Sequence, residues 1–306
     1  METNPKIFVI IVTYKGHRWY NTCFTSLREL EIPVQVVVID NASNDGTVDY
    51  IQEKFPEVHF IESKENLGFG RANNLGMRYA LDNGADYVFL LNQDAWVEPN
   101  TIGELVRVAK KYPEYGILSP LHLTKEKDKI EPNFISFISY YAGTSQSIIN
   151  DLYFGQLKEV YTNKYANAAG WLLPRKTLEE IGGFCPLIYH YGEDDDYLNR
   201  LHYHNMKLGI CPHARMVHDA MVKSDFSISL NQKARLLDVD EIIDINSPIS
   251  IKKQVFILLK RGVKSVIRGK ANDSTENLKK VKYILQNYKQ IFYCMQMHKK
   301  KQSCWL

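Results

Sequence analysis

Short apolar runs that alternate with helix-patterned segments constrain the fold of this chain more than any other feature. Residues 7–13 and 34–39 are rich in β-branched side chains and have the length of strands, and residues 17–30 between them carry a helix-compatible pattern. Because neither run alternates regularly with polar residues, both faces of each strand should be buried. A strand, a helix and a second buried strand in this order predict a parallel βαβ unit.

The alternation continues beyond this unit. A helix is expected at residues 45–54, a third strand at 58–61, a helix from Gly68 to the Asn83-Gly84 pair, and a fourth strand at 87–91. This order predicts an α/β fold in which a mostly parallel sheet is flanked by helices on both faces. Ligands of such sheets collect at the carboxyl ends of the strands. The polar residues of this chain cluster at those ends.

The rest of residues 1–225 is less regular. A helix beginning at Pro99 is followed by residues 121–164, which have weak periodicity and many aromatic side chains, and which we expect to form irregular loops and short strands. Further helices are expected at residues 174–181 and 193–205. We expect residues 1–225 to form one domain.

The charge of the chain is unevenly distributed. The formal net charge is +3, yet residues 251–306 carry 14 Lys or Arg against 2 Asp or Glu. Residues 226–306 are therefore expected to form a basic helical C-terminal region that contacts an anionic membrane surface, the domain formed by residues 1–225 or a second copy of the chain. No recognition motif for nucleic acid accompanies the basic residues, so nucleic acid is not an expected partner. A heptad seam is predicted from apolar residues spaced alternately by three and four: Leu278, Val281, Leu285, Tyr288, Phe292 and Met295.

Three observations bear on localisation. The five cysteines are scattered and lack a CxxC spacing, which fits a reducing compartment. The apolar run near the N-terminus is short and no small-residue cleavage site follows it. No stretch reaches the roughly 18 uncharged apolar residues of a membrane-spanning helix. We expect a cytoplasmic protein, peripheral on the inner face of the plasma membrane if the basic region binds lipid.

An acidic residue follows the second predicted strand directly. Asp40 begins the polar segment DNASNDGT, and a carboxylate at this rim can accept a hydrogen bond from a nucleobase or a ribose hydroxyl. The same segment is also explained as a turn and a helix cap, with Ser43 and Asn44 as capping residues. Both interpretations remain open from the residues alone.

Asn92 and Asp94 follow the fourth predicted strand. In an extended segment, side chains two residues apart point the same way, so an amide oxygen and a carboxylate can converge on Mg²⁺ or Mn²⁺. Such an ion would neutralise a diphosphate leaving group. A polar turn after the strand is the alternative.

Four acidic residues, 193–196, stand at a predicted helix start. Acidic residues are favourable at a helix N-terminus for dipole reasons alone, but four exceed what capping needs. Crowded carboxylates raise one another's pKa, which suits a general base. Arg200 lies four residues after Asp196, and the pair could lock the orientation of the helix. His218 ends a short segment, residues 214–218, and single histidines are more often structural than ligands.

Taken in order, these segments resemble the family 2 glycosyltransferases of the Rossmann-like GT-A fold, particularly the bacterial rhamnosyltransferase-like branch. The resemblance covers roughly residues 6–220, and the order and spacing of its motifs are more specific than any one of them. It is carried by residues 9–14 (VIIVTY), 40–43 (DNAS), 65–74 (ENLGFGRANN), 90–94 (LLNQD), 169–171 (AGW), 182–184 (GGF) and 192–196 (GEDDD), and by His218.

The resemblance implies a role for each matching residue. Asp194 would be the catalytic base, and Glu193 and Asp196 would orient the acceptor and the helix. Asp94 would be the principal metal ligand and His218 a second. The nucleotide-sugar site would contain Thr13, Tyr14, Asp40, Asn41, Arg71, Asn73, Asn92, Gln93 and Trp171, with the first three at the nucleoside.

The sequence departs from the family pattern in three places. Asn92 replaces the first acidic residue of the usual Asp-x-Asp, which leaves the metal site one charge short. Lys15 stands where many relatives have Asn. The run Asp194 to Asp196 leaves the choice of base open if the register slips.

The resemblance implies an inverting, metal-dependent glycosyltransferase with Mn²⁺ or Mg²⁺ as cofactor. It would move a hexosyl or deoxyhexosyl group from a UDP- or dTDP-sugar to a hydroxyl of a saccharide or lipid-linked saccharide in bacterial cell-surface polysaccharide synthesis. The alternative is a catalytically weak, membrane-associated scaffold subunit of a glycan-assembly complex, which Asn92 and the basic region motivate. A sugar nucleotidyltransferase fits less well, because the chain lacks an early Gly-rich loop for a triphosphate.

Overall fold

The residues that the structure describes form one sheet of nine strands. The structure is a computed structural model that describes residues 4–140, 147–219 and 239–306, so the expected domain boundary at residues 225 and 226 lies outside the described residues. The strands are β1 (Ile7–Thr13), β2 (Gln35–Asp40), β3 (His59–Glu62), β4 (Tyr87–Asn92), β5 (Ala95–Val97), β6 (Tyr115–Leu123), β7 (Tyr161–Asn163), β8 (Gly170–Pro174) and β9 (Lys207–His218).

The strand order is β3-β2-β1-β4-β8-β6-β9-β5, and β7 pairs with β9. The first four strands in this order are parallel, as the alternating pattern predicts. β8 is antiparallel to both β4 and β6, and β5 and β7 are antiparallel to β9. The sheet is therefore mixed rather than mostly parallel. A buried apolar run such as β8 shows that a strand is present but not in which direction it enters the sheet.

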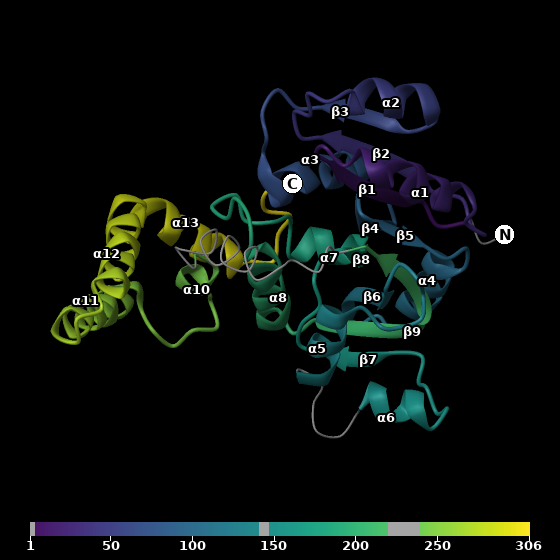
Figure 1. The fold of residues 1–306 in the computed structure, drawn as a ribbon. Helices are drawn as coiled ribbons and strands as arrows, with labels where there is room; N and C mark the ends of the chain where they lie inside the picture. Colours follow the sequence, from purple (N-terminus) through teal and green to yellow (C-terminus); the bar gives the residue numbers. More distant parts are fainter. Residues whose placement is uncertain (1–3, 141–146, 220–238) are drawn as a thin grey trace.

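Helices cover both faces of the sheet, as predicted (Figure 1). Phe8 and Ile10 of β1 face a core that includes the helix α3, whereas Val9 and Ile11 face a second core that includes α1, α2 and α4. The helices of this part are α1 (His17–Arg28), α2 (Thr47–Lys54), α3 (Gly68–Asp82), α4 (Thr101–Lys111), α5 (Pro132–Tyr140), α6 (Ile148–Tyr153), α7 (Arg175–Glu180) and α8 (Glu193–Tyr203).

The start of α2 differs from the sequence expectation. Gly46 rather than Ser43 or Asn44 occupies the N-cap position, with φ +82° and no side-chain cap. Asp45 instead accepts hydrogen bonds from the backbone N–H and the hydroxyl of Thr47, at 3.3 and 2.6 Å. A glycine reaches this left-handed conformation without a steric penalty. The Ser43 hydroxyl, expected as a cap, accepts from the backbone N–H of Lys15 at 3.1 Å instead.

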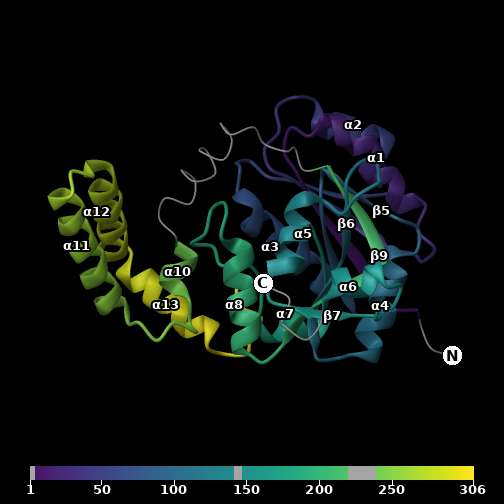
Figure 2. The same ribbon diagram turned by 60° about the horizontal axis from the view of Figure 1, so that its bottom comes forward.

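The described part of the C-terminal region, residues 239–306, contains α10 (Val239–Ile243), α11 (Ile251–Ile267), α12 (Ala271–Gln286) and α13 (Tyr288–His298). α11 and α12 form a hairpin that stands away from the sheet, with α10 and α13 between it and α8 (Figures 1 and 2). The predicted heptad seam is wrong, because most of its members are exposed: Leu278, Leu285, Tyr288 and Phe292. Val281 is the seam member that is buried, and the other buried positions, Ile284, Ile291 and Cys294, lie outside the predicted seam.

Residues 299–306, which we call the C-terminal strap, return to the catalytic part of the chain. The backbone N–H of Gly183 donates to the carbonyl of Cys304 at 2.8 Å, and the N–H of Gln302 donates to the carbonyl of Glu180 at 3.0 Å. Gly182 has φ +81°, and a Cβ there would overlap the backbone of Cys304. The Gly182-Gly183 turn is therefore the place where a second chain segment approaches closely.

Candidate active site

The loop after β2 is organised by the Asp40 carboxylate. The hydroxyl of Thr13 donates to Asp40 Oδ1 at 2.9 Å, and the backbone N–H of Ser43 donates to Oδ2 at 2.7 Å. The N–H of Asn41 donates to the carbonyl of Thr13 at 2.8 Å. Asp40 is fully buried in this arrangement. These hydrogen bonds stabilise the turn after β2, and they hold the carboxyl ends of β1 and β2 in place.

Gln93 fixes the backbone of Tyr14. Gln93 Oε1 accepts from the Tyr14 N–H at 2.8 Å, and Gln93 Nε2 donates to the Tyr14 carbonyl at 3.1 Å. The Tyr14 ring is 42% exposed, and the Lys15 ammonium lies 5.2 Å from its centroid. The sequence analysis placed Gln93 in the nucleotide-sugar site without foreseeing this bond pair. The residue type was the one available signal in the sequence, because a primary amide can accept from a backbone N–H and donate to a backbone C=O at the same time.

Asp94 and His218 meet across a strand pair. β5 and β9 are antiparallel with Ala95 opposite His218, which places Asp94 Oδ1 3.6 Å from His218 Nε2. The N–H of Asp219 donates to the carbonyl of Asp94 at 2.9 Å and closes the end of this ladder. The sequence analysis assumed that Asn92 and Asp94 lie in an extended segment and point the same way. This assumption is wrong, because Gln93 and Asp94 form a turn after β4. The structure brings Asp94 to His218 instead.

The Asp94 carboxyl is ionised in this setting. Burial opposes ionisation, but the nearby His218 imidazole and the Arg18 guanidinium stabilise the carboxylate and leave the pKa of Asp94 below its ordinary value. One carboxylate oxygen and one imidazole nitrogen suit Mn²⁺ or Mg²⁺ if diphosphate and water oxygens complete the coordination. His218 Nδ1 is buried and has no hydrogen-bond partner among the described residues. The two side chains fit a divalent ion, although the described residues contain no group of three or more His, Cys, Asp or Glu that could hold one alone.

His122 lies behind His218 and was not foreseen from the sequence. Its ring centroid is 5.9 Å from that of His218 at a near-perpendicular angle, and it stacks on Phe134 at 4.1 Å. Burial and the neighbouring His218 hold the pKa of His122 well below its ordinary value, so the ring is neutral. A neutral aromatic ring here supports His218 without adding a competing positive charge. His122 sits in an apolar strand, where the sequence alone gives a histidine no distinguishing feature.

The acidic cluster at the start of α8 divides into two kinds of side chain. Glu193 and Asp196 are buried, whereas Asp194 and Asp195 are partly exposed. Asp196 Oδ2 accepts from Arg200 Nε at 2.9 Å, which confirms the i,i+4 pair expected from the sequence. Asp196 therefore orients the helix; the expectation that it also orients the acceptor does not fit a carboxylate closed inside the protein. Asp194 and Asp195 are both exposed enough to contact a substrate, and the family resemblance favours Asp194.

The N-terminus of α3 connects α8 to the sheet edge. Asn41 accepts from the Leu67 N–H at 2.9 Å and donates to the Gly68 carbonyl at 3.1 Å. Arg71 donates twice to the carbonyl of Pro186, at 3.0 and 2.6 Å, on the loop that leads into α8. Asn73 is buried and donates to the Phe69 carbonyl at 3.0 Å within its own helix. These three residues hold backbone segments beside the expected donor site.

Trp171 has the position of a core residue. Its side chain is fully buried, and its ring stacks on Phe184 with centroids 6.3 Å apart and tilts against Tyr197 at 5.8 Å. Trp171 was expected in the nucleotide-sugar site. The structure places it in the core instead, where it packs against Phe184 and against Tyr197 of α8.

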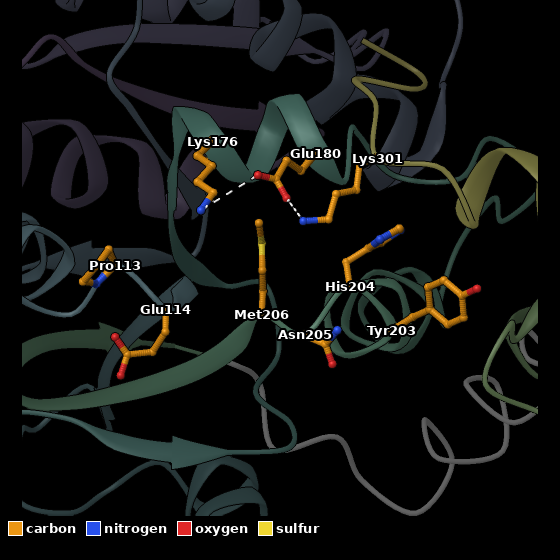
Figure 3. A pocket seen from close by; sticks show the side chains of 9 residues that line it. All are labelled: Pro113, Glu114, Lys176, Glu180, Tyr203, His204, Asn205, Met206 and Lys301. Atoms are coloured by element: carbon orange, nitrogen blue, oxygen red, sulfur yellow. Dashed lines mark hydrogen bonds and ion pairs between the residues drawn. The ribbon is translucent and has the colours of Figure 1, made fainter.

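A pocket of about 360 Å³ lies at the other end of α8 (Figure 3). It is formed by Glu180 and Lys176 of α7, Lys301 of the strap, and residues 203–206 at the end of α8. Lys301 and Lys176 both point to the Glu180 carboxylate, with N···O distances of 2.5 and 3.9 Å. An 11-residue helix is about 16 Å long, so this pocket is separated from the acidic first turn of α8. It does not belong to the candidate active site.

Residues 8–181, more than half of the chain, match the family model described as glycosyl transferase family 2. The chain belongs to glycosyltransferase family 2. It is 28% identical over 217 residues to the N-acetylglucosaminyl-diphospho-decaprenol L-rhamnosyltransferase of Mycobacterium tuberculosis, covering 63% of this chain and 69% of the relative. It is 23% identical to the dTDP-rhamnosyl transferase RfbF of Shigella flexneri, covering 84% and 81%. This family 2 glycosyltransferase is therefore an enzyme of the rhamnosyltransferase-like branch.

Solved structures confirm the GT-A fold of the glycosyltransferase. The mannosyltransferase PcManGT from Pyrobaculum calidifontis, solved with GDP-Man and Mn²⁺, superposes with a TM-score of 0.58 at 17% identity and covers 97% of this chain and 85% of its own. The S. aureus TarS structure gives a TM-score of 0.54 at 16% identity, and this chain spans 42% of that longer protein. Within the described residues, the family 2 glycosyltransferase has no helix of the length and apolarity needed to cross a bilayer.

Proposed function

We propose that this glycosyltransferase is an inverting, divalent-metal-dependent enzyme that moves a deoxyhexosyl group from a dTDP- or UDP-sugar to a hydroxyl of a lipid-linked saccharide in cell-surface polysaccharide synthesis. The approach of Asp94 to His218 at 3.6 Å, at the sheet edge where the Thr13–Asp40 loop lies, carries the proposal. The names of two relatives, one acting on a diphospho-decaprenol and the other on a dTDP-rhamnosyl donor, support this choice of substrates.

The donor would lie along the carboxyl edge of β1, β2 and β4. Tyr14 and the Asp40 loop would hold the nucleoside, with the exposed Tyr14 ring available for stacking on the base. Asp94 and His218 would hold Mn²⁺ or Mg²⁺, which when bound supplies positive charge to the diphosphate oxygens of the donor. Arg71 and Asn73 would border the sugar from α3. Asn92 lacks a charge, so the donor diphosphate itself would contribute most of the remaining negative charge at the metal.

Asp194 would be the general base for the acceptor. It would take the proton of the acceptor hydroxyl as the oxygen forms its bond to the anomeric carbon and the bond from that carbon to the diphosphate oxygen breaks. A single displacement of this kind inverts the configuration, and no covalent sugar adduct is needed. Glu193 is buried beside α3, where a Cβ at Gly70 would lie 4.0 Å from the Glu193 Cβ, and would position this turn of α8.

We also propose that residues 1–225 are the glycosyltransferase domain and residues 226–306 a basic region that brings the enzyme to its acceptor at a membrane. The strap supports a close association of the two parts, because Cys304 and Gln302 bond to the backbone around α7. A homo-oligomer formed through the C-terminal helices is the alternative use of this region. The scaffold function would require that no sugar is transferred at all.

The test is a thermal-shift screen of nucleotide sugars followed by a transfer assay. The melting temperature should rise with dTDP- or UDP-sugars more in the presence of Mn²⁺ than in its absence, because ligands that bind only the native state stabilise it. Transfer to a polyprenyl-diphospho-saccharide acceptor should then depend on Mn²⁺ or Mg²⁺ and give a product of inverted anomeric configuration. GDP-mannose serves as the mismatched donor. Binding of the sugar nucleotide without any transfer or hydrolysis would favour the scaffold function instead.

A further inference from the structure

The outer face of α11 carries a continuous apolar stripe. Its members are spaced by three, four, three and one residues, so they lie on one side of the helix, and their exposed fractions run from 42% to 80%. A stripe from the first to the last of these residues is about 16 Å long. The stripe consists of Phe256, Leu259, Val263, Val266 and Ile267.

The face of α11 next to the stripe, about a quarter-turn around the helix, is used for packing on α12 and the helices beyond it. Val255 and Leu258 are partly buried against a cluster that contains Ile284 of α12. Gly262 is buried, and a Cβ there would lie 3.8 Å from the Asn277 Cβ and 3.8 Å from the Ser274 hydroxyl, so the two helices approach closely. The stripe is therefore not the face that holds the hairpin together. The stripe remains exposed to solvent when the hairpin of α11 and α12 has folded.

Basic side chains flank the stripe. Lys253, Lys260 and Lys264 are exposed and follow one edge of the stripe at helical spacing, and the Lys260 ammonium lies 4.6 Å from the centroid of the Phe256 ring. α11 contains no Asp or Glu. Lysine stems cover apolar surface while their ammonium groups reach beyond it. An apolar stripe edged by lysines matches the boundary between the acyl chains and the anionic headgroups of a bilayer.

We propose that the stripe of α11 docks in the plane of an anionic lipid surface. A second copy of this chain fits less well, because residues 251–306 carry 14 basic and 2 acidic residues and a symmetric interface would place these like charges together. Nucleic acid would leave the five apolar side chains without partners. The inference deepens the proposed function by naming how the enzyme meets a membrane-borne acceptor, and it rests on that function only for the location of the acceptor.

The experiment is flotation of the full chain with vesicles of equal parts phosphatidylcholine and phosphatidylglycerol, in the absence of donor and acceptor. Val263→Asp with Ile267→Asp changes two exposed positions, so the fold should be retained, and should weaken vesicle partitioning more than about tenfold. Lys260→Gln and Lys264→Gln should each weaken it about fivefold, a loss that rising salt should reproduce in the parent chain. Tyr153→Asp on α6 and Lys110→Gln on α4, both exposed positions far from α11 in sequence, are the matched controls and should leave partitioning unchanged.

Equal partitioning of the parent and the Val263→Asp, Ile267→Asp variant would overturn the proposal, as would equal binding to pure phosphatidylcholine vesicles. A lipid-free dimer that Val263→Asp dissociates in sedimentation would assign the stripe to a second copy and would also overturn it. The proposed function is read separately, from transfer to a short-chain acceptor dispersed without vesicles. Loss of flotation with transfer intact supports the docking face, whereas loss of transfer alone concerns the catalytic site.

Discussion

The Asp196 carboxylate and the Arg200 guanidinium lie 2.9 Å apart, with only 2% and 1% of their side chains exposed. Arg200 also donates to the carbonyls of Ile181 and Gly183, both at 2.9 Å, and so joins α8 to the turn on which the strap rests. His298 of α13 approaches the other oxygen of Asp196 at 3.6 Å. The first turn of α8, with the proposed base, is thus held from its buried side by the C-terminal region.

Breaking this pair should destabilise the protein strongly. Asp196→Asn leaves the Arg200 charge buried without its counterion, and we expect the free energy of unfolding in urea to fall by about 3–5 kcal/mol. Glu179→Gln is the matched control, because Arg175 and Glu179 have the same i,i+4 spacing and a 2.7 Å contact on an exposed helix face. That change should cost less than about 1 kcal/mol. Equal losses for both variants would contradict a structural role for Asp196.

Asp194→Asn should abolish sugar transfer while leaving nucleotide binding within a few fold, because the amide cannot accept the acceptor proton. Asp195→Asn, the adjacent and similarly exposed change, should retain most of the activity. Transfer rates and calorimetric binding of the nucleotide should be measured for both variants. If Asp195→Asn is the inactive one, the base is the next residue along α8; if Asp194→Asn keeps full turnover, the assignment is wrong.

Removing either proposed metal ligand should weaken Mn²⁺ binding. Asp94→Asn and His218→Gln should each raise the Mn²⁺ concentration needed for half-maximal nucleotide binding by at least about tenfold. Asp219→Asn is the control, since Asp219 follows His218 directly but accepts from the indole N–H of Trp19 at 2.9 Å. Nucleotide binding titrated with Mn²⁺ measures the effect. A shift of the same size in Asp219→Asn would indicate general disruption of the strand end.

Gly182→Ala should displace the strap. The added methyl group would meet the Cys304 backbone and would also hold alanine at a positive φ, so we expect a loss of more than about 3 kcal/mol in the free energy of unfolding. Gly84→Ala shares the positive φ, at +78°, but has open space around it and should lose only about 1 kcal/mol. Denaturant unfolding of both variants separates the steric effect of the strap from backbone strain.

The parts of the fold that follow from local pattern were predictable. β1 to β4 and the helices between them were located correctly, because buried β-branched runs and glycine breaks are local signals. The antiparallel direction of β8 was not, since strand direction depends on pairing partners distant in sequence. The seam in α12 and α13 failed for a related reason: the chain breaks at Asn287, so one continuous helical register does not apply.

At the candidate site, contacts within one helix were predictable and contacts between segments distant in sequence were not. The Asp196–Arg200 pair came from helical spacing, which a sequence displays directly. The neighbourhood of Asp94 and His218 depends on the β5–β9 ladder, and only the family resemblance suggested it. The roles of Gln93 and Trp171 differ from the expectation because backbone clamping and burial are properties of the folded chain.

The strap also has a consequence for biosynthesis. Every strand of the sheet leaves the ribosome before residues 299–306. Those residues nevertheless bond to the Gly182-Gly183 turn, whose Gly183 carbonyl accepts from Arg200. A nascent chain can assemble its sheet early, because domains fold as their segments emerge. The contacts that hold α8 in place are still incomplete at that stage. The order of synthesis therefore delays the completion of the contacts around α8 until the helices of the C-terminal region have been made.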